Sequence, residues 1–223
     1  SNSLFLWIVC FIILVNWLGH HRSLAAIGLG SLPECTRISL LLTAAFLLLY
    51  AGDIFFSIRN AKQIRQLKEE WQETAPFLPV HNKELPAYIF MCFTAAVCEE
   101  IIFRGFLLNY TISNARYLSI AEYWAVIIPA VIFALAHYYQ GWKAVFKIAF
   151  LSVLFGYIYL QSASLWIVIV LHFAVDLTGG LLSIRYLDEP EEDITNTPGN
   201  ADNIPGVFDS APDLPAENRI TED

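Results

Sequence analysis

Long runs of apolar residues dominate the first 187 residues of this chain. Six such stretches can be marked, at residues 4–18, 38–58, 85–108, 123–139, 144–160 and 165–184. A helix crosses the roughly 30 Å hydrocarbon core of a bilayer with about 20 residues, and most of these stretches approach that length. Because backbone polar groups in lipid must be satisfied internally, runs without alternation indicate helices and not a β-barrel. The pattern predicts an all-α, polytopic membrane helix bundle of about six transmembrane helices.

The first stretch, residues 4–18, is short for a membrane span. A signal peptide is the alternative interpretation, although the basic residues that normally precede its apolar region are absent here. The chain also begins without Met, which leaves open whether residues precede Ser1.

Between the second and third stretches the pattern changes. From Ile58 to Trp71 apolar residues recur every three or four positions, with basic residues between them. This spacing is typical of an amphipathic helix lying at a membrane surface, with a solvated linker helix as the alternative.

The basic residues between the stretches predict the orientation, because Lys and Arg concentrate on the cytoplasmic side of a membrane. If six helices alternate, the second and fourth loops and the C-terminal end share one side. That side holds Arg59, Lys62, Arg65, Lys68, Lys83, Lys143, Lys147 and Arg185, and the other holds Arg22, Arg37 and Arg116. The sequence therefore predicts a multi-pass protein of the cell (inner) membrane with both termini in the cytoplasm.

The composition agrees with a membrane protein and sets the C-terminal end apart. The chain is 57% hydrophobic and 15% charged, whereas soluble domains carry about a quarter charged residues. The formal charge of −8 arises in residues 188–223, which hold 11 of the 21 acidic residues and one base, Arg219. Five prolines and few large apolar residues in this segment are typical of disorder. We predict a transmembrane domain at residues 1–187 and a disordered acidic tail at 188–223.

The remaining composition limits other interpretations. The acidity excludes a general nucleic-acid binder, which would need a basic face. Four cysteines lack paired or metal-type spacing and are interpreted as packing residues. They are Cys10, Cys35, Cys92 and Cys98. The sequence does not determine an oligomeric state.

Ionisable residues in the third, fourth and sixth stretches are candidates for chemistry, and each costs about 2.5–3.5 kcal/mol when charged near the bilayer centre. They are Glu99, Glu100 and Arg104 in the third stretch, His137 at the end of the fourth, and His172 and Asp176 in the sixth. Residues four apart share a helix face, so Glu100 can pair with Arg104. By the same spacing Asp176 can orient or charge His172. Glu99 has no partner at helical spacing, and the rise per residue allows it to meet both histidines inside the membrane.

A Glu and two His on separate membrane helices fit two kinds of hydrolytic site. In the first, Glu99 is a general base that takes a proton from a water held with His137, and donors around His172 stabilise the oxyanion. In the second, Glu99, His137 and His172 hold zinc, with one open position for water. The sequence lacks HExxH, the usual local signature of such a zinc site.

The same residues and their neighbours form three short motifs on successive apolar stretches. These are Glu99-Glu100-x-x-x-Arg104, Phe133-x-x-x-His137 and His172-x-x-x-Asp176. In this order they resemble the three motifs of the CPBP family, the CAAX proteases and bacteriocin-processing enzymes also called Abi intramembrane proteases. The likeness extends through residues 156–160 and 164–166, is closest to the bacterial branch, and covers about residues 85–180.

The resemblance implies an intramembrane endopeptidase of the glutamate type in residues 1–187, with a motif-bearing core at 85–184. By motif position, Glu99 would be the base and His137 its partner in activating water. His172 and Asp176 would form the oxyanion-binding side, with Asp176 orienting His172 because an ionised Asp cannot donate a hydrogen bond. Glu100 and Arg104 would support this arrangement. No cofactor is favoured, and zinc is the alternative, since some descriptions of the family invoke a metal.

The expected partners are the lipid bilayer and a peptide or (lipo)protein substrate, cut near the cytoplasmic side. Two other functions stay open. A non-catalytic scaffold or bacteriocin-immunity protein would use the same pocket for binding. A proton-coupled transporter also uses Glu and His in the membrane, but it normally has broken helices or an inverted repeat, and neither is evident here.

Overall fold

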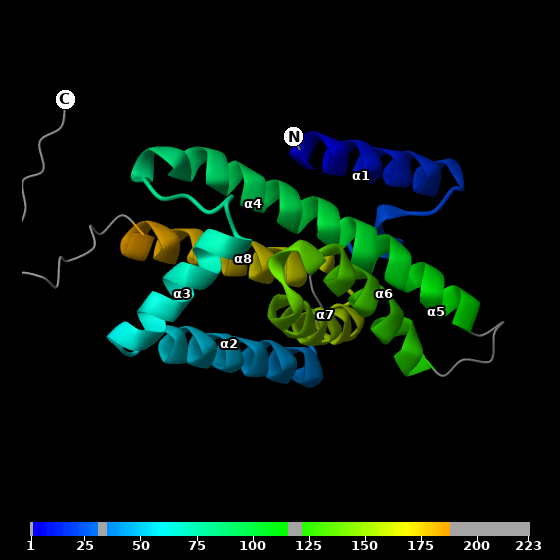
Figure 1. Cartoon of the computed structure of the whole chain (residues 1–223). Coiled ribbons are helices and arrows are strands. Elements are labelled where there is room, and N and C mark those ends of the chain that lie inside the picture. Colours follow the sequence, from blue (N-terminus) through cyan, green and yellow to red (C-terminus); the bar gives the residue numbers. More distant parts are fainter. Residues whose placement is uncertain (1, 31–34, 116–121, 188–223) are drawn as a thin grey trace, which may run out of the picture. The chain divides into compact units, whose positions relative to one another are not determined.

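The computed structural model of the chain describes residues 2–30, 35–115 and 122–187 (Figure 1). Within these residues every element is a helix and no β-strand occurs. The predicted all-α fold is therefore confirmed. The predicted acidic tail, residues 188–223, lies outside the described residues, so its disorder stays a prediction.

Five of the six predicted stretches fall in helices, and the fourth, residues 123–139, runs past the end of its helix at Ala136. Those helices are α1 (Asn2–Gly19), α2 (Arg37–Ile58), α4 (Leu85–Glu100), α6 (Glu122–Ala136), α7 (Trp142–Ser162) and α8 (Leu165–Leu187). The third stretch continues from α4 into a π-helix, η3 (Ile101–Leu108), and then into α5 (Asn109–Ala115). Three short 3₁₀ segments connect helices: η1 (Leu24–Ile27), η2 (Asn82–Glu84) and η4 (Tyr138–Gln140).

Four of the described helical segments are long and apolar enough to cross a membrane. They are Arg37–Ile58, Asn82–Ala115, Trp142–Ser162 and Leu165–Leu187. The apolar helices Ser3–Gly19 and Trp124–Ala136 are shorter. The molecule is thus a multi-pass membrane helix bundle, and the count of six spans stays a prediction.

The amphipathic segment forms a helix, as predicted. It is α3 (Ala61–Thr74), which begins after Asn60, whose side chain accepts a hydrogen bond from the Gln63 amide. This cap satisfies one of the amides that the first turn of a helix leaves without a partner. The basic residues Arg65 and Lys62 are exposed, while Ile64 is partly buried. Its location at a membrane surface stays a prediction.

The elements that carry the motifs pack directly on one another. Helix α4 lies against α8 and α1, and α7 lies against α6, α2 and α8 (Figure 1). Buried residues such as Ala96, Ile158 and Val168 form the core between them. On the outside, large apolar side chains including Phe11 and Leu48 are exposed. Such an outer surface suits contact with lipid chains.

Candidate active site

The motif residues come together from three parts of the bundle. Glu99 and Glu100 are the last residues of α4, and Arg104 follows in η3. His137 directly follows α6, and His172 and Asp176 are one turn apart in α8. This is the convergence that the spacing allowed. Figure 1 shows α4 running alongside α8.

The Glu99 carboxylate faces both histidines. Its Oε2 lies 4.0 Å from Nε2 of His137 and 3.9 Å from Nε2 of His172. Both distances exceed that of a direct hydrogen bond. Oε2 is also buried and has no hydrogen-bond partner among the described residues. A buried carboxylate oxygen without a partner costs free energy. Oε2 of Glu100 is likewise buried and unpartnered among the described residues, so the feature that distinguishes Glu99 is that its Oε2 faces Nε2 of both histidines.

The tautomer of His137 follows from its own helix. Its Nδ1 lies 2.8 Å from the carbonyl oxygen of Phe133. A carbonyl only accepts, so Nδ1 carries the proton and a neutral ring presents the lone pair of Nε2 toward Glu99. The ring also contacts that of Phe133, with centroids 4.6 Å apart. The Phe133-x-x-x-His137 spacing therefore sets both the position and the proton arrangement of His137.

Glu100 and Arg104 form the predicted ion pair. Nη1 of Arg104 donates to Oε1 of Glu100 at 2.7 Å. Glu100 is 0% exposed and Arg104 is 3% exposed. Nη2 of Arg104 donates to the Ser152 hydroxyl at 2.8 Å. The guanidinium also lies 4.8 Å from the ring centroid of Phe133 and 5.5 Å from that of Phe155. Hydrogen bonds and two aromatic faces thus replace the water that this buried cation gives up.

His172 is held by Glu100, a contact that the sequence did not predict. Its Nδ1 lies 2.8 Å from Oε1 of Glu100, the same oxygen that accepts from Arg104. Asp176 lies on the opposite side of the ring, with Oδ2 3.5 Å from Nε2. The spacing predicts that Asp176 can orient or charge His172 and that Glu100 can pair with Arg104. In the structure Glu100 joins the two, so that Ser152, Arg104, Glu100 and His172 form one continuous chain of polar contacts.

The π-helix η3 is a second feature without a sequence signal. π-Helices are rare in proteins, and those that do occur often lie at functional sites. Here η3 begins directly after Glu100 and contains Arg104. The Asn109 side chain donates to the carbonyl oxygen of Gly105 at 2.7 Å and so provides a partner within the wider turn.

The alternative of zinc at Glu99, His137 and His172 is not tested by the structure. Among the described residues, no group of three or more His, Cys, Asp or Glu side chains has the arrangement needed to hold a metal ion. Oε2 of Glu99 lies 4.0 Å from Nε2 of His137 and 3.9 Å from Nε2 of His172. Nδ1 of His137 contacts the Phe133 carbonyl, and Nδ1 of His172 contacts Glu100.

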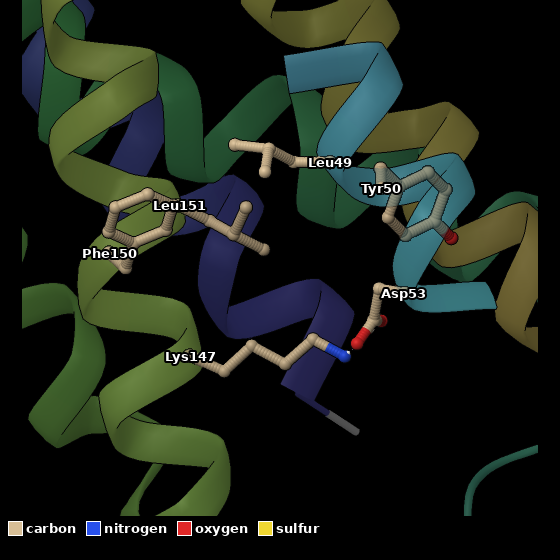
Figure 2. A pocket seen from close by; sticks show the side chains of 6 residues that line it. All are labelled: Leu49, Tyr50, Asp53, Lys147, Phe150 and Leu151. Carbon is tan, nitrogen blue, oxygen red and sulfur yellow. Dashed lines mark hydrogen bonds and ion pairs between the residues drawn. The ribbon is translucent and has the colours of Figure 1, made fainter. Parts of the chain in front are cut away.

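Two further pockets lie apart from the motif residues. The first, about 170 Å³, lies between α2 and α7 and is lined by Leu49, Tyr50, Asp53, Lys147, Phe150 and Leu151. Figure 2 shows Lys147 and Asp53 pointing toward each other there, as an ion pair between the two helices. The second, about 470 Å³, is a polar groove lined by Gln66, Glu69, Glu70, Glu73, Thr74, Gln140, Gly141, Trp142 and Lys143.

Comparison with known families bears on this cluster. Residues 81–178 match the family model described as type II CAAX prenyl endopeptidase Rce1-like. The match confirms the resemblance to CPBP membrane endopeptidases, and the segment contains all seven motif residues from Glu99 to Asp176. At the family level this part of the chain is similar to CAAX-type intramembrane proteases, a class of hydrolases. No curated protein and no solved structure matches the chain.

Proposed function

We propose that the protein is an intramembrane endopeptidase that hydrolyses a peptide bond of a peptide or (lipo)protein near the cytoplasmic side of the membrane. The proposal rests on one observation above all, the buried and unpartnered Oε2 of Glu99, which faces Nε2 of both His137 and His172. The match of residues 81–178 to a CAAX endopeptidase family supports it. The basic residues of the second loop support a cytoplasmic location for both termini.

Water would be activated between Glu99 and His137. Nδ1 of His137 is committed to the Phe133 carbonyl, so Nε2 is an acceptor, as is Oε2 of Glu99. A water that donates one O–H to each acceptor keeps a lone pair free to attack a carbonyl carbon. Glu99 takes the proton as the C–O bond forms, which is general base catalysis.

The oxyanion would be stabilised by His172. Because Nδ1 donates to Glu100, the ring carries a proton on Nε2 only when it is an imidazolium. The carboxylates of Glu99, Glu100 and Asp176 surround this ring and stabilise its positive charge. Nε2–H can then donate to the oxygen on which negative charge develops. When the C–N bond breaks, the proton on Glu99 passes to the leaving nitrogen.

This scheme uses the chain's own residues and no cofactor. Zinc held by Glu99, His137 and His172 is the alternative. Metal content of the purified protein separates the two. Stoichiometric zinc that disappears in His172→Ala would support the metalloprotease.

The decisive test is Glu99→Gln, which keeps the shape of the side chain and removes the base. The probe is a fluorogenic peptide ending in a CAAX sequence, prepared with and without a farnesyl group on its cysteine. We expect cleavage to fall by about 10²–10⁴-fold, the usual contribution of a general base. The control is Glu69→Gln, which changes an exposed acid on α3 and should cleave like the parent.

Parent-like cleavage by Glu99→Gln would contradict the proposal. If Glu99→Gln and His137→Ala also keep full activity in cells, the non-catalytic scaffold or immunity function gains support instead. The inactive Glu99→Gln protein further serves to trap natural substrates from membranes for identification by mass spectrometry.

A further inference from the structure

Two tyrosines from different helices hydrogen-bond to consecutive carbonyls of α8 beside the candidate site. The hydroxyl of Tyr88, in α4, donates to the backbone oxygen of Asp176 at 2.9 Å. The hydroxyl of Tyr50, in α2, donates to the backbone oxygen of Val175 at 3.1 Å. A carbonyl oxygen has two lone pairs, so each can accept a tyrosine in addition to its partner within the helix. These bonds therefore add fixed points between helices at the turn that carries Asp176.

Tyr88 also packs on α8 one turn further along. The residue is 6% exposed. A Cβ atom added at Gly180 would lie 2.1 Å from Cε1 of Tyr88, so the ring rests directly on the α8 backbone. This contact requires glycine at position 180. At the neighbouring Gly179, an added Cβ would have nothing within 4 Å.

The contacts of Tyr88 and the bond between Glu100 and His172 tie the same two helices at two places. Tyr88 and Glu100 both belong to α4 and are twelve residues apart, or about 18 Å along the helix axis. Two such points determine how far α8 is shifted and rotated against α4. That shift sets the 3.9 Å separation between Glu99 and Nε2 of His172.

We propose that Tyr88 is a positioning residue of the candidate site. Its hydroxyl and its ring hold α8 in the register that presents His172 and Asp176 to Glu99. The inference rests on the proposed proteolytic function for its effect on catalysis. A displacement of about 1 Å at reacting groups can lower a rate by about 100-fold. Loss of the Tyr88 contacts therefore lowers kcat and leaves KM nearly unchanged, because the buried Tyr88 acts through the α8 backbone.

The test uses two substitutions and a matched control. Tyr88→Phe keeps the ring and removes only the hydroxyl, so it preserves packing. Gly180→Ala keeps the hydroxyl and forces the ring away. Gly179→Ala makes the same chemical change one residue earlier, in open space. With the fluorogenic CAAX peptide we expect kcat to fall by about 10- to 100-fold in Tyr88→Phe and in Gly180→Ala, and to stay at the parent value in Gly179→Ala.

A second measurement needs no substrate. The ¹⁵N resonances of the His172 ring, recorded on the full chain in lipid nanodiscs and assigned with His172→Gln, report its contacts with Glu100, Glu99 and Asp176. They should shift in Tyr88→Phe and Gly180→Ala and stay in place in Gly179→Ala. If Tyr88 only stabilised the bundle away from the site, the His172 resonances would not differ between Tyr88→Phe and Gly179→Ala.

The outcomes separate the two proposals. If Glu99→Gln still cleaves the peptide, the proteolytic function fails, while the His172 resonances still decide whether Tyr88 positions α8. If Glu99→Gln is inactive and Tyr88→Phe cleaves with the kcat of the parent, the positioning role is overturned. If the parent does not cleave the peptide, unshifted His172 resonances in Tyr88→Phe overturn that role and shifted ones support it.

Discussion

Replacing Arg104 with Met should leave a buried negative charge beside His172. Glu100 is completely buried, and its Oε1 accepts from both Arg104 and His172. Met fills a similar volume but carries no charge. The substitution therefore removes the cation opposite Glu100 and the donor to the Ser152 hydroxyl, while the surrounding Phe133 and Phe155 rings keep an apolar neighbour.

The size of the effect follows from the burial of the pair. Breaking a buried ion pair by removing one partner costs about 3–5 kcal/mol, and in this variant the contact with His172 is what remains to Oε1 of Glu100. Replacing both partners by apolar or neutral groups is much less costly. We therefore expect Arg104→Met to lower the free energy of unfolding by about 3–5 kcal/mol. The double substitution Glu100→Gln with Arg104→Met should recover about 1–3 kcal/mol of that loss.

Catalysis should not recover together with stability. In the double variant, Nδ1 of His172 has lost its carboxylate partner, and the imidazolium needed at the oxyanion is less stabilised. Loss of one oxyanion donor typically costs about 10²–10³-fold in kcat. Unfolding by SDS titration, followed by tryptophan fluorescence, measures stability, and cleavage of the fluorogenic CAAX peptide measures kcat.

Two results would refute this reasoning. A cost below about 1 kcal/mol for Arg104→Met would mean that the pair behaves like an exposed one. Parent-like kcat in the stabilised double variant would mean that Glu100 has no part in holding His172 for the reaction. Ser152→Ala serves as a milder companion, since it removes one hydrogen bond to Arg104 and keeps both charges.

The remaining predictions concern parts of the chain outside this cluster. Lys147→Met breaks the ion pair with Asp53 seen in Figure 2, in which the Lys147 and Asp53 side chains are 54% and 42% exposed. The free energy of unfolding should fall by about 1 kcal/mol or less if the pair lies at the aqueous interface. A fall of about 2.5–3.5 kcal/mol would place the pair in hydrocarbon instead. Truncation after Leu187 removes the acidic tail and should leave the rate of peptide cleavage intact; a loss of cleavage would show that residues 188–223 act in the reaction.

Much of the fold could be predicted because it depends on local pattern. Apolar runs of near-spanning length predicted the helices that carry the bundle, since a membrane leaves a backbone few other ways to satisfy its polar groups. The amphipathic spacing before Trp71 predicted α3 for a similarly local reason. The Glu100–Arg104 pair followed from residues four apart on one helix. The motif residues stood out because charge is costly in an apolar stretch.

The contacts between helices could not be predicted in this way. Several of these contacts join residues far apart in sequence. They are the hydrogen bond between His172 and Glu100, the one between Arg104 and the Ser152 hydroxyl, and the contacts of the Tyr88 hydroxyl and ring with α8. Helical periodicity states which residues share a face, but it does not state how far one helix is shifted along another. The contact of Glu100 with His172, beside that of Asp176, therefore had no signal in the sequence. The sequence by itself determined which helices form and which residues are candidates for chemistry, and only the packing of α4 against α8 decided which of those residues touch.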